Sequence, residues 1–142
     1  QTLVSTSSDQ TIKLWDLSTN KCLKALRGDT SCSPSVAVSP DNKIIASSSQ
    51  DHRILLWDFK TGECIKSFQG HTATIWSIAF SSDNQTLVSR SENETIRFWH
   101  PKTGKNQKTL RAKKPYSGMQ IKGAKGLTEA TIATLQALGG VS

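Results

Sequence analysis

The residue types of nucleophilic catalysis, serine, cysteine, histidine and aspartate, all occur in this sequence of 142 residues. A catalytic triad would need a Ser or Cys next to a His that a carboxylate orients. No local pattern joins such residues here, and His71, Asp9 and Asp51 fall on positions that recur along the chain. Repeats rarely encode a single active site, because each copy mainly serves the packing of its own unit. We therefore expect structural hydrogen bonds from these residues, and no enzyme.

Metal and cofactor sites are not indicated by the sequence either. Cys22, Cys32 and Cys64 are an odd number without a Cys-x-x-Cys pair, which argues against a disulfide framework and a zinc site. Because Cys22 and Cys64 occupy equivalent positions, we expect them to be packed as small hydrophobic residues. No Gly-x-x-x-x-Gly-Lys-Ser/Thr phosphate loop is present. The sequence thus predicts no metal, no cofactor and a reducing, cytoplasmic location.

An internal repeat must position these residues. Trp15, Trp57 and Trp99 are each 42 residues apart. The same step relates Gly28 to Gly70, Cys22 to Cys64, Ser39 to Ser81 and Asp41 to Asp83. Self-similarity at a fixed period of this size is the signature of a repeat architecture.

Each period contains four short strand-like segments. In the copy from 70 to 111 we expect strands at 74–80, 85–89, 95–99 and 106–110, separated by polar turns. Strands spaced 8 to 12 residues apart indicate an all-β fold. Segments such as Ile54-Leu55-Leu56-Trp57 are apolar without alternation, which suits a sheet covered on both faces.

These features resemble the WD-repeat family, whose signature is a Gly-His pair, a Ser-Pro-Asp-Gly-like turn and a closing Trp-Asp. The matching residues are Gly70-His71, Ser39-Pro40-Asp41-Asn42, Trp15-Asp16 and Trp57-Asp58. The resemblance covers about residues 1 to 111 and implies a partial β-propeller of about three four-stranded antiparallel blades, the first incomplete. The blades are expected at about 1–27, 28–69 and 70–111. Closed propellers need typically 4 to 8 blades, so we expect a fragment whose remaining blades lie in its parent chain.

The resemblance also implies a buried hydrogen-bond network in each blade, formed by a His, a strand Ser or Thr, a turn Asp and the Trp. Position matching gives Ser5, Asp9 and Trp15 in the first blade, Ser47, Asp51 and Trp57 in the second, and His71, Ser89, Asn93 and Trp99 in the third. No blade has the full set: Asp29 replaces the second His, and Asn93 replaces the third Asp. Such replacements satisfy fewer polar groups, so looser blades are expected.

Beyond residue 111 the repeat stops, and a basic tail at 112–142 follows. Thr128 can cap a short helix at about 129–138, with Ile132, Leu135 and Leu138 on one face. The stretch from 126 to 139 resembles a tail that closes some cyanobacterial WD-repeat and pentapeptide-repeat proteins. That resemblance implies a large bacterial protein that carries an upstream STAND-type nucleotide-switch domain and uses the propeller as a sensor or brake in signal transduction.

The net charge of +7 originates at the C-terminal end. Residues 1–100 carry 10 Lys/Arg and 10 Asp/Glu, whereas 101–142 carry 8 basic residues and one acid. Sequence-independent nucleic-acid binding by this end is the alternative function. Because one aromatic residue, Tyr116, accompanies the charges and no reading motif is visible, a solvated tail is the preferred interpretation. No apolar run is long enough to span a membrane.

The predicted function is therefore protein binding as a scaffold or sensor segment, because a propeller presents a broad rigid face with variable loops. The resemblance places partner contacts just before the turn Asp and at the start of the first strand. These positions are Ser8, Gln50, Glu92, Cys32, Pro34, Thr74 and Trp76. We single out Trp76 because an exposed Trp is a common interface anchor, although strict alternation would group it with Ile78 and Phe80 on a packed face.

Overall fold

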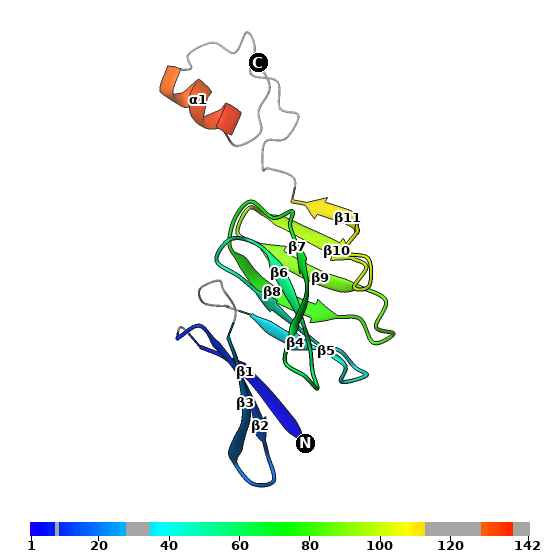
Figure 1. Ribbon diagram of the computed structural model, residues 1–142. Helices are drawn as coiled ribbons and strands as arrows, with labels where there is room; N and C mark the ends of the chain where they lie inside the picture. The colour runs from blue at the N-terminus through cyan, green and yellow to red at the C-terminus, as the bar shows by residue number, and fades with distance from the viewer. Residues whose placement is uncertain (8, 28–34, 113–128, 138–142) are drawn as a thin grey trace. The chain divides into compact units, whose positions relative to one another are not determined.

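The computed structural model describes residues 1–7, 9–27, 35–112 and 129–137 (Figure 1). The chain forms two compact units, Gln1–Leu110 and Arg111–Ser142. The first unit contains three β-sheets, and the second contains the helix α1 (Glu129–Ala137). No helix in the described part of the chain is long and apolar enough to cross a membrane.

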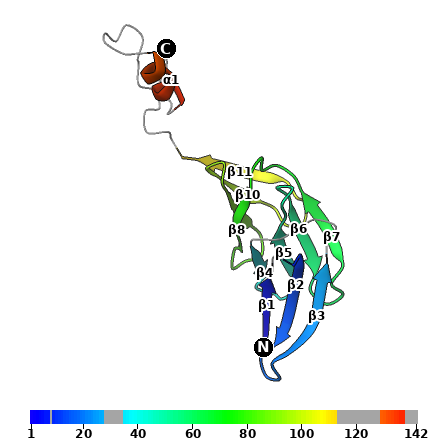
Figure 2. The same ribbon diagram turned by 90° about the vertical axis from the view of Figure 1, so that its left-hand side faces the viewer.

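The three sheets follow one another along the chain and are called blades 1 to 3. Blade 1 has the order β1-β2-β3, blade 2 the order β4-β5-β6-β7, and blade 3 the order β8-β9-β10-β11. Figure 2 shows the strands of blade 1 side by side. The strand bounds are β1 Thr2–Thr6, β2 Thr11–Asp16, β3 Lys21–Arg27, β4 Val36–Val38, β5 Ile44–Ser48, β6 Ile54–Asp58, β7 Cys64–Phe68, β8 Ile75–Phe80, β9 Leu87–Ser91, β10 Thr95–Trp99 and β11 Asn106–Arg111. The predicted fold class, an all-β partial propeller with an incomplete first blade and a short helix, is confirmed.

Hydrogen bonds in one turn move the start of one expected strand. We expected the second strand of blade 3 at 85–89, but β9 runs from Leu87 to Ser91. The turn before it extends further because the Ser81 hydroxyl accepts the Thr86 N–H (2.9 Å) and the Asp83 carboxylate accepts the Gln85 N–H (2.9 Å). These bonds hold residues 81–86 in a turn and delay the start of the strand.

Left-handed backbone conformations recur with the 42-residue period. The turns β1–β2, β5–β6 and β9–β10 place Gln10, His52 and Glu94 at φ of 68°, 66° and 62°. The next turn places Asn20, Gly62 and Gly104 at φ of 56°, 80° and 75°. Since side chains other than Gly and Asn are disfavoured in this region, the blade architecture imposes the first of these turns against local preference.

Apolar side chains pack between neighbouring blades. One buried cluster joins Ile12, Leu14 and Leu26 of blade 1 to Ile45 and Trp57 of blade 2. A second joins Ala46, Ile54, Leu56 and Phe68 of blade 2 to Ile75, Ile78, Leu87 and Trp99 of blade 3. The middle strands of blade 2 are therefore covered on both faces, which explains why Ile54-Leu55-Leu56-Trp57 is apolar without alternation.

The outer strands do not follow the expectation for the cysteines. Cys22 and Cys64 were expected to be packed, but both thiols are exposed. Each outer strand has one free edge, and in β3 and β7 the only fully buried apolar side chains are Leu26 and Phe68. The matching positions of Cys22 and Cys64 therefore identified the structural repeat correctly but did not predict whether these side chains are buried.

Candidate functional site

A continuous chain of hydrogen bonds crosses blade 3. The Trp99 indole N–H donates to the Ser89 hydroxyl (2.8 Å), and that hydroxyl lies 2.7 Å from His71 Nε2. On the other side of the ring, His71 Nδ1 lies 3.2 Å from the Thr95 hydroxyl, which donates to Asn93 Oδ1 at 2.5 Å. Every hydroxyl and ring nitrogen of this path therefore has a partner inside the blade.

The directions of these bonds require a neutral imidazole. If Thr95 donates to Asn93, it accepts from His71 Nδ1–H, and His71 Nε2 is left to accept the Ser89 proton. A protonated ring would donate from Nε2 to Ser89, and the Ser89 proton would then have no acceptor within this chain of hydrogen bonds. In agreement, burial, with further contributions from Arg97 and His52, lowers the pKa of His71 from 6.5 to about 4.

The pairing of Ser89 with His71 does not create a nucleophile in the folded chain. Ser89 has no exposed surface, and His71 is only 6% exposed. A substrate carbonyl would have to approach within bonding distance of the Ser89 oxygen. The buried pair can orient strands, but in this conformation it cannot reach a substrate.

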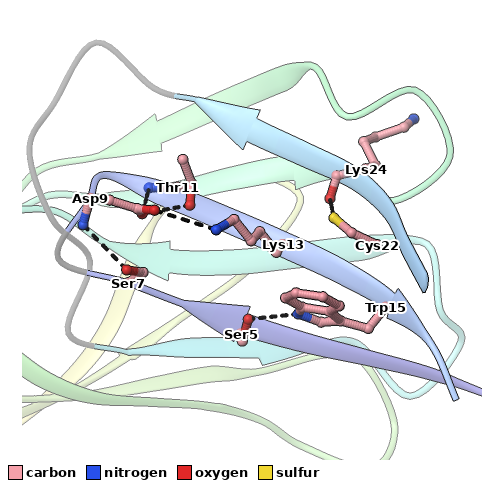
Figure 3. A network of polar contacts seen from close by, with 8 residues as sticks. All are labelled: Ser5, Ser7, Asp9, Thr11, Lys13, Trp15, Cys22 and Lys24. Atoms are coloured by element: carbon pink, nitrogen blue, oxygen red, sulfur yellow. Dashed lines mark hydrogen bonds and ion pairs between the residues drawn. The ribbon is translucent and has the colours of Figure 1, made fainter. Parts of the chain in front are cut away.

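Blades 1 and 2 contain shorter versions of the network. The Trp15 indole N–H donates to Ser5, and that of Trp57 to Ser47, both at 2.9 Å. Asp9 accepts instead from the N–H (3.1 Å) and hydroxyl (2.6 Å) of Thr11. Figure 3 shows these two groups apart, with Asp9 at the start of β2 and the Ser5–Trp15 pair towards its end.

The turn carboxylates of these two blades serve their own turns. Hydrogen bonds, above all from the Thr11 hydroxyl, lower the pKa of Asp9 to about 2. Asp51 of blade 2 is ion-paired with Arg53 at 2.8 Å. Arg53 stands where blades 1 and 3 have Thr11 and Thr95.

One member of the blade 3 chain, Thr95, was absent from the residues named by position matching. The available signal was a Thr two residues after the turn Asp or Asn in blades 1 and 3, at Thr11 and Thr95. Thr95 allows Asn93 to take the place of an aspartate, because an amide oxygen accepts the Thr95 proton as a carboxylate would.

The candidate partner-binding face centres on Trp76, which is 51% exposed. In the β8–β9 pairing, Ile75 is opposite Ser91 and Ser77 is opposite Arg90, so Trp76 is the extra residue of a β-bulge. The bulge changes the alternation phase: Ile78 is buried against blade 2, whereas Trp76 is turned away from that packed face. The exposure expected of Trp76 is observed.

The other candidate contact residues are distributed over blades 2 and 3. Glu92 is exposed, and its N–H donates to the Thr74 carbonyl at 2.9 Å, so both lie beside the start of β8. Gln50 is exposed in the turn between β5 and β6 of blade 2. Ser8, Cys32 and Pro34 lie outside the described residues.

The two described cysteines, Cys22 and Cys64, do not belong to a metal site. The Cys22 and Cys64 thiols contact the Lys24 and Lys66 carbonyls at 3.5 and 3.7 Å. No cluster of three metal-ligating side chains occurs in the described part of the chain. Most of the basic tail, including Lys113, Lys114, Tyr116, Lys122 and Lys125, falls outside the described residues.

Comparison with protein families accounts for the repeat. The family model "WD domain, G-beta repeat" matches residues 1–16, 20–58 and 62–100, which together make up more than half of the chain. The three matches include Trp15, Trp57 and Trp99.

Proposed function

Since the chain belongs to the WD-repeat family, we propose that residues 1–111 are a protein-binding scaffold and that Trp76 anchors the partner. The observation that supports this most directly is a large aromatic side chain, half exposed, on a strand fixed by its neighbours. Ile75 and Ile78, on either side of it, are buried in the cluster between blades 2 and 3. Rigid attachment lowers the entropy that binding must overcome.

The exposed part of Trp76 is large enough to matter energetically. A Trp side chain buries 150–250 Å² in a core or interface, and Trp76 retains about half of its surface for a partner. At roughly 25 cal/mol per Å², covering it would contribute about 2–3 kcal/mol. This is the range of an interface hot spot.

The rim of this face is polar and carries charges of both signs, from Glu92 and from the exposed Arg90 opposite Ser77. Glu92 forms no ion pair with another described residue, and Thr74 offers a hydroxyl beside it. A rim carboxylate chiefly selects partners and speeds their association, by attracting Lys or Arg. The proposed partner therefore presents an apolar side chain to Trp76 and a basic group to Glu92.

The proposal extends to the cellular compartment and to a sensor role. Exposed thiols at Cys22 and Cys64 favour a reducing compartment such as the cytoplasm. A sensor role beside a nucleotide-switch domain is supported by the resemblance of 126–139 alone.

The test is affinity capture from an extract of the source cells with three forms of the chain. Wild type and Leu23→Ala, which removes another exposed apolar side chain, should retain the same protein, and Trp76→Ala should lose it. Thermal melts establish that all three fold equally. Equal capture by Trp76→Ala contradicts the proposal. Capture that nuclease abolishes, or that declines steeply with salt, would assign nucleic-acid binding instead.

A further inference from the structure

The carboxylate of Asp58 holds together the turn between β6 and β7. Its Oδ1 accepts the backbone N–H groups of Lys60 (2.9 Å) and Thr61 (2.7 Å). The pKa of Asp58 is lowered, chiefly by the Thr61 N–H, and the charge of Lys24 from blade 1 contributes as well. The turn of blade 2 therefore binds a charged carboxylate with two N–H groups, near an ammonium from the preceding blade.

Asp16 has the same role in the turn between β2 and β3. It accepts the N–H (2.9 Å) and the hydroxyl (2.7 Å) of Ser18 and the hydroxyl of Thr19 (2.8 Å). Hydrogen bonds from such donors to an ionised carboxylate are roughly twice as strong as those between neutral groups. A carboxylate bound in this turn is thus a feature that blades 1 and 2 share.

Blade 3 keeps the turn, between β10 and β11, but has no carboxylate in it. His100 stands 42 residues after Asp58. The Gly104 N–H donates to the His100 carbonyl at 2.8 Å, the same distance as from the Gly62 N–H to the Asp58 carbonyl, and φ is 75° at Gly104 and 80° at Gly62. His100 Nδ1 is buried without a hydrogen-bond partner among the described residues. This nitrogen therefore does not replace Asp58 Oδ1 as an acceptor.

The donors around the missing carboxylate remain in the sequence and in the structure. Lys102 and Thr103 occupy the positions of the two residues whose N–H groups bind the carboxylate in blade 2. Lys66 occupies the position of Lys24, and its ammonium donates to the Lys102 carbonyl. The Lys24 ammonium makes the matching bond in blade 2 at 2.7 Å. Two backbone donors and an ammonium are therefore arranged as in blade 2, without the acid that they bind there.

The strand register places this turn at the end of blade 3 that is remote from Trp76. Trp99, which precedes the turn, and Phe80, at the end of β8, are both opposite Leu87. Trp76 lies near the start of β8. A ligand of this turn would therefore be held on a different part of blade 3 from the partner proposed for Trp76.

The charge of the turn is not balanced by acids of its own segment. Residues 100–111 include no Asp or Glu and four basic residues, Lys102, Lys105, Lys108 and Arg111. None of the four, nor Lys66, forms an ion pair with another described residue. Asp83 follows β8 at the same end of the blade, but it accepts the Gln85 N–H (2.9 Å) and the Ser81 hydroxyl of its own turn. The local charge therefore favours an anion from solution.

We infer that the turn from His100 to Gly104 is a binding site for a carboxylate supplied by another molecule, as the side chain of an Asp or Glu residue. The bound carboxylate accepts the Lys102 and Thr103 N–H groups and lies near the Lys66 ammonium. A carboxylate is the ligand that the same arrangement holds in blade 2, where Asp58 provides it from within the chain.

The experiment follows the backbone amide NMR signals of the full chain during a titration with sodium acetate, with sodium chloride at equal ionic strength as the reference. The Lys102 and Thr103 signals should shift with acetate until they saturate, with a Kd on the order of 10 mM. The Lys60 and Thr61 signals are the internal control and should not shift, because their N–H groups are already bonded to Asp58.

Substitutions test each part of the site. His100→Asp supplies the carboxylate from the chain itself, so it should abolish the response to acetate and raise the Tm by roughly 2–4 °C. Lys66→Met should weaken acetate binding by roughly three- to tenfold, whereas the matched Lys24→Met should leave it unchanged. Trp76→Ala should also leave it unchanged, which separates this site from the proposed protein-binding face.

Three results would overturn the inference. The first is a response of Lys102 and Thr103 to acetate that is no larger than their response to chloride, or that Lys60 and Thr61 share. The second is an undiminished response in His100→Asp, which would place the acetate elsewhere. The third is saturation of the same signals by inorganic phosphate at lower concentration than by acetate, which would make the turn a phosphate site.

Discussion

Acidification should destabilise the blades through His71 before any carboxylate with a lowered pKa titrates. The pKa of His71 is about 4 in the folded chain and 6.5 as the ordinary value. Between these values the unfolded chain binds a proton that the folded chain does not, so stability falls as pH falls. The loss begins near pH 6.5, reaches about 2 kcal/mol at pH 5 and levels off at about 3 kcal/mol below pH 4.

The pH range of this stability loss is specific to His71. Hydrogen bonds, chiefly from the hydroxyls of Thr11 and Ser18, lower the pKa values of Asp9 and Asp16 to about 2, so these groups lose their stabilising effect only below pH 4. Chemical denaturation at intervals between pH 8 and pH 4 measures the free energy of unfolding. His71→Gln should be less stable at pH 8 but should lose most of the slope between pH 6.5 and 4. His100→Gln, in another turn, should keep it.

An unchanged pH slope in His71→Gln would refute the reasoning. It would mean that the ring is accessible to protons in the folded state, or that other groups carry the acid sensitivity. A slope that disappears in both variants would equally contradict the assignment to the buried chain of Trp99, Ser89, His71 and Thr95.

Three further predictions concern the packing and turns of the blades. Trp57→Ala removes a side chain that is 4% exposed between blades 1 and 2, and it should lower the free energy of unfolding by about 3–5 kcal/mol. Trp15→Ala, at a half-buried position, should lower it less, and thermal melts will measure the difference. Gln10→Gly should stabilise by about 0.5–1 kcal/mol, because φ at Gln10 is 68°, and Gln10→Val should destabilise; denaturant midpoints that change in the opposite order would contradict this. Ser39→Ala leaves the Ile44 N–H without its hydroxyl acceptor (2.9 Å) and should cost about 1–3 kcal/mol, whereas the exposed Ser82→Ala should have almost no effect on the same midpoint.

Turn chemistry is local, and much of it was readable in the sequence. Ser39-Pro40-Asp41 predicted a turn, and the Ser39 hydroxyl does donate to Asp41 (2.7 Å) while it accepts the Ile44 N–H. The end of that turn was harder to predict, because the delay of β9 to Leu87 depends on side-chain bonds to Gln85 and Thr86.

The candidate site was less accessible from sequence. Residue types marked Trp76 as an anchor but left its orientation open, because a bulge that changes the alternation phase has no signal in Ile75-Trp76-Ser77 itself. Thr95 could have been found from its spacing to Asn93, but its place between Asn93 and His71 depends on how close the strands approach one another.

The 42-residue period by itself determined the all-β fold class, the division into blades and the alignment of Trp15, Trp57 and Trp99 with their serines ten residues earlier, because strands and turns of fixed length repeat within one period. Only the tertiary structure decided which of the residues at matching repeat positions also have the same surroundings. Leu26, Phe68 and Leu110 share one sequence position, yet Leu26 and Phe68 are covered by a glycine turn and Leu110 is open. The physical reason is that burial here arises between blades, and a residue's own repeat does not encode which surface lies against it.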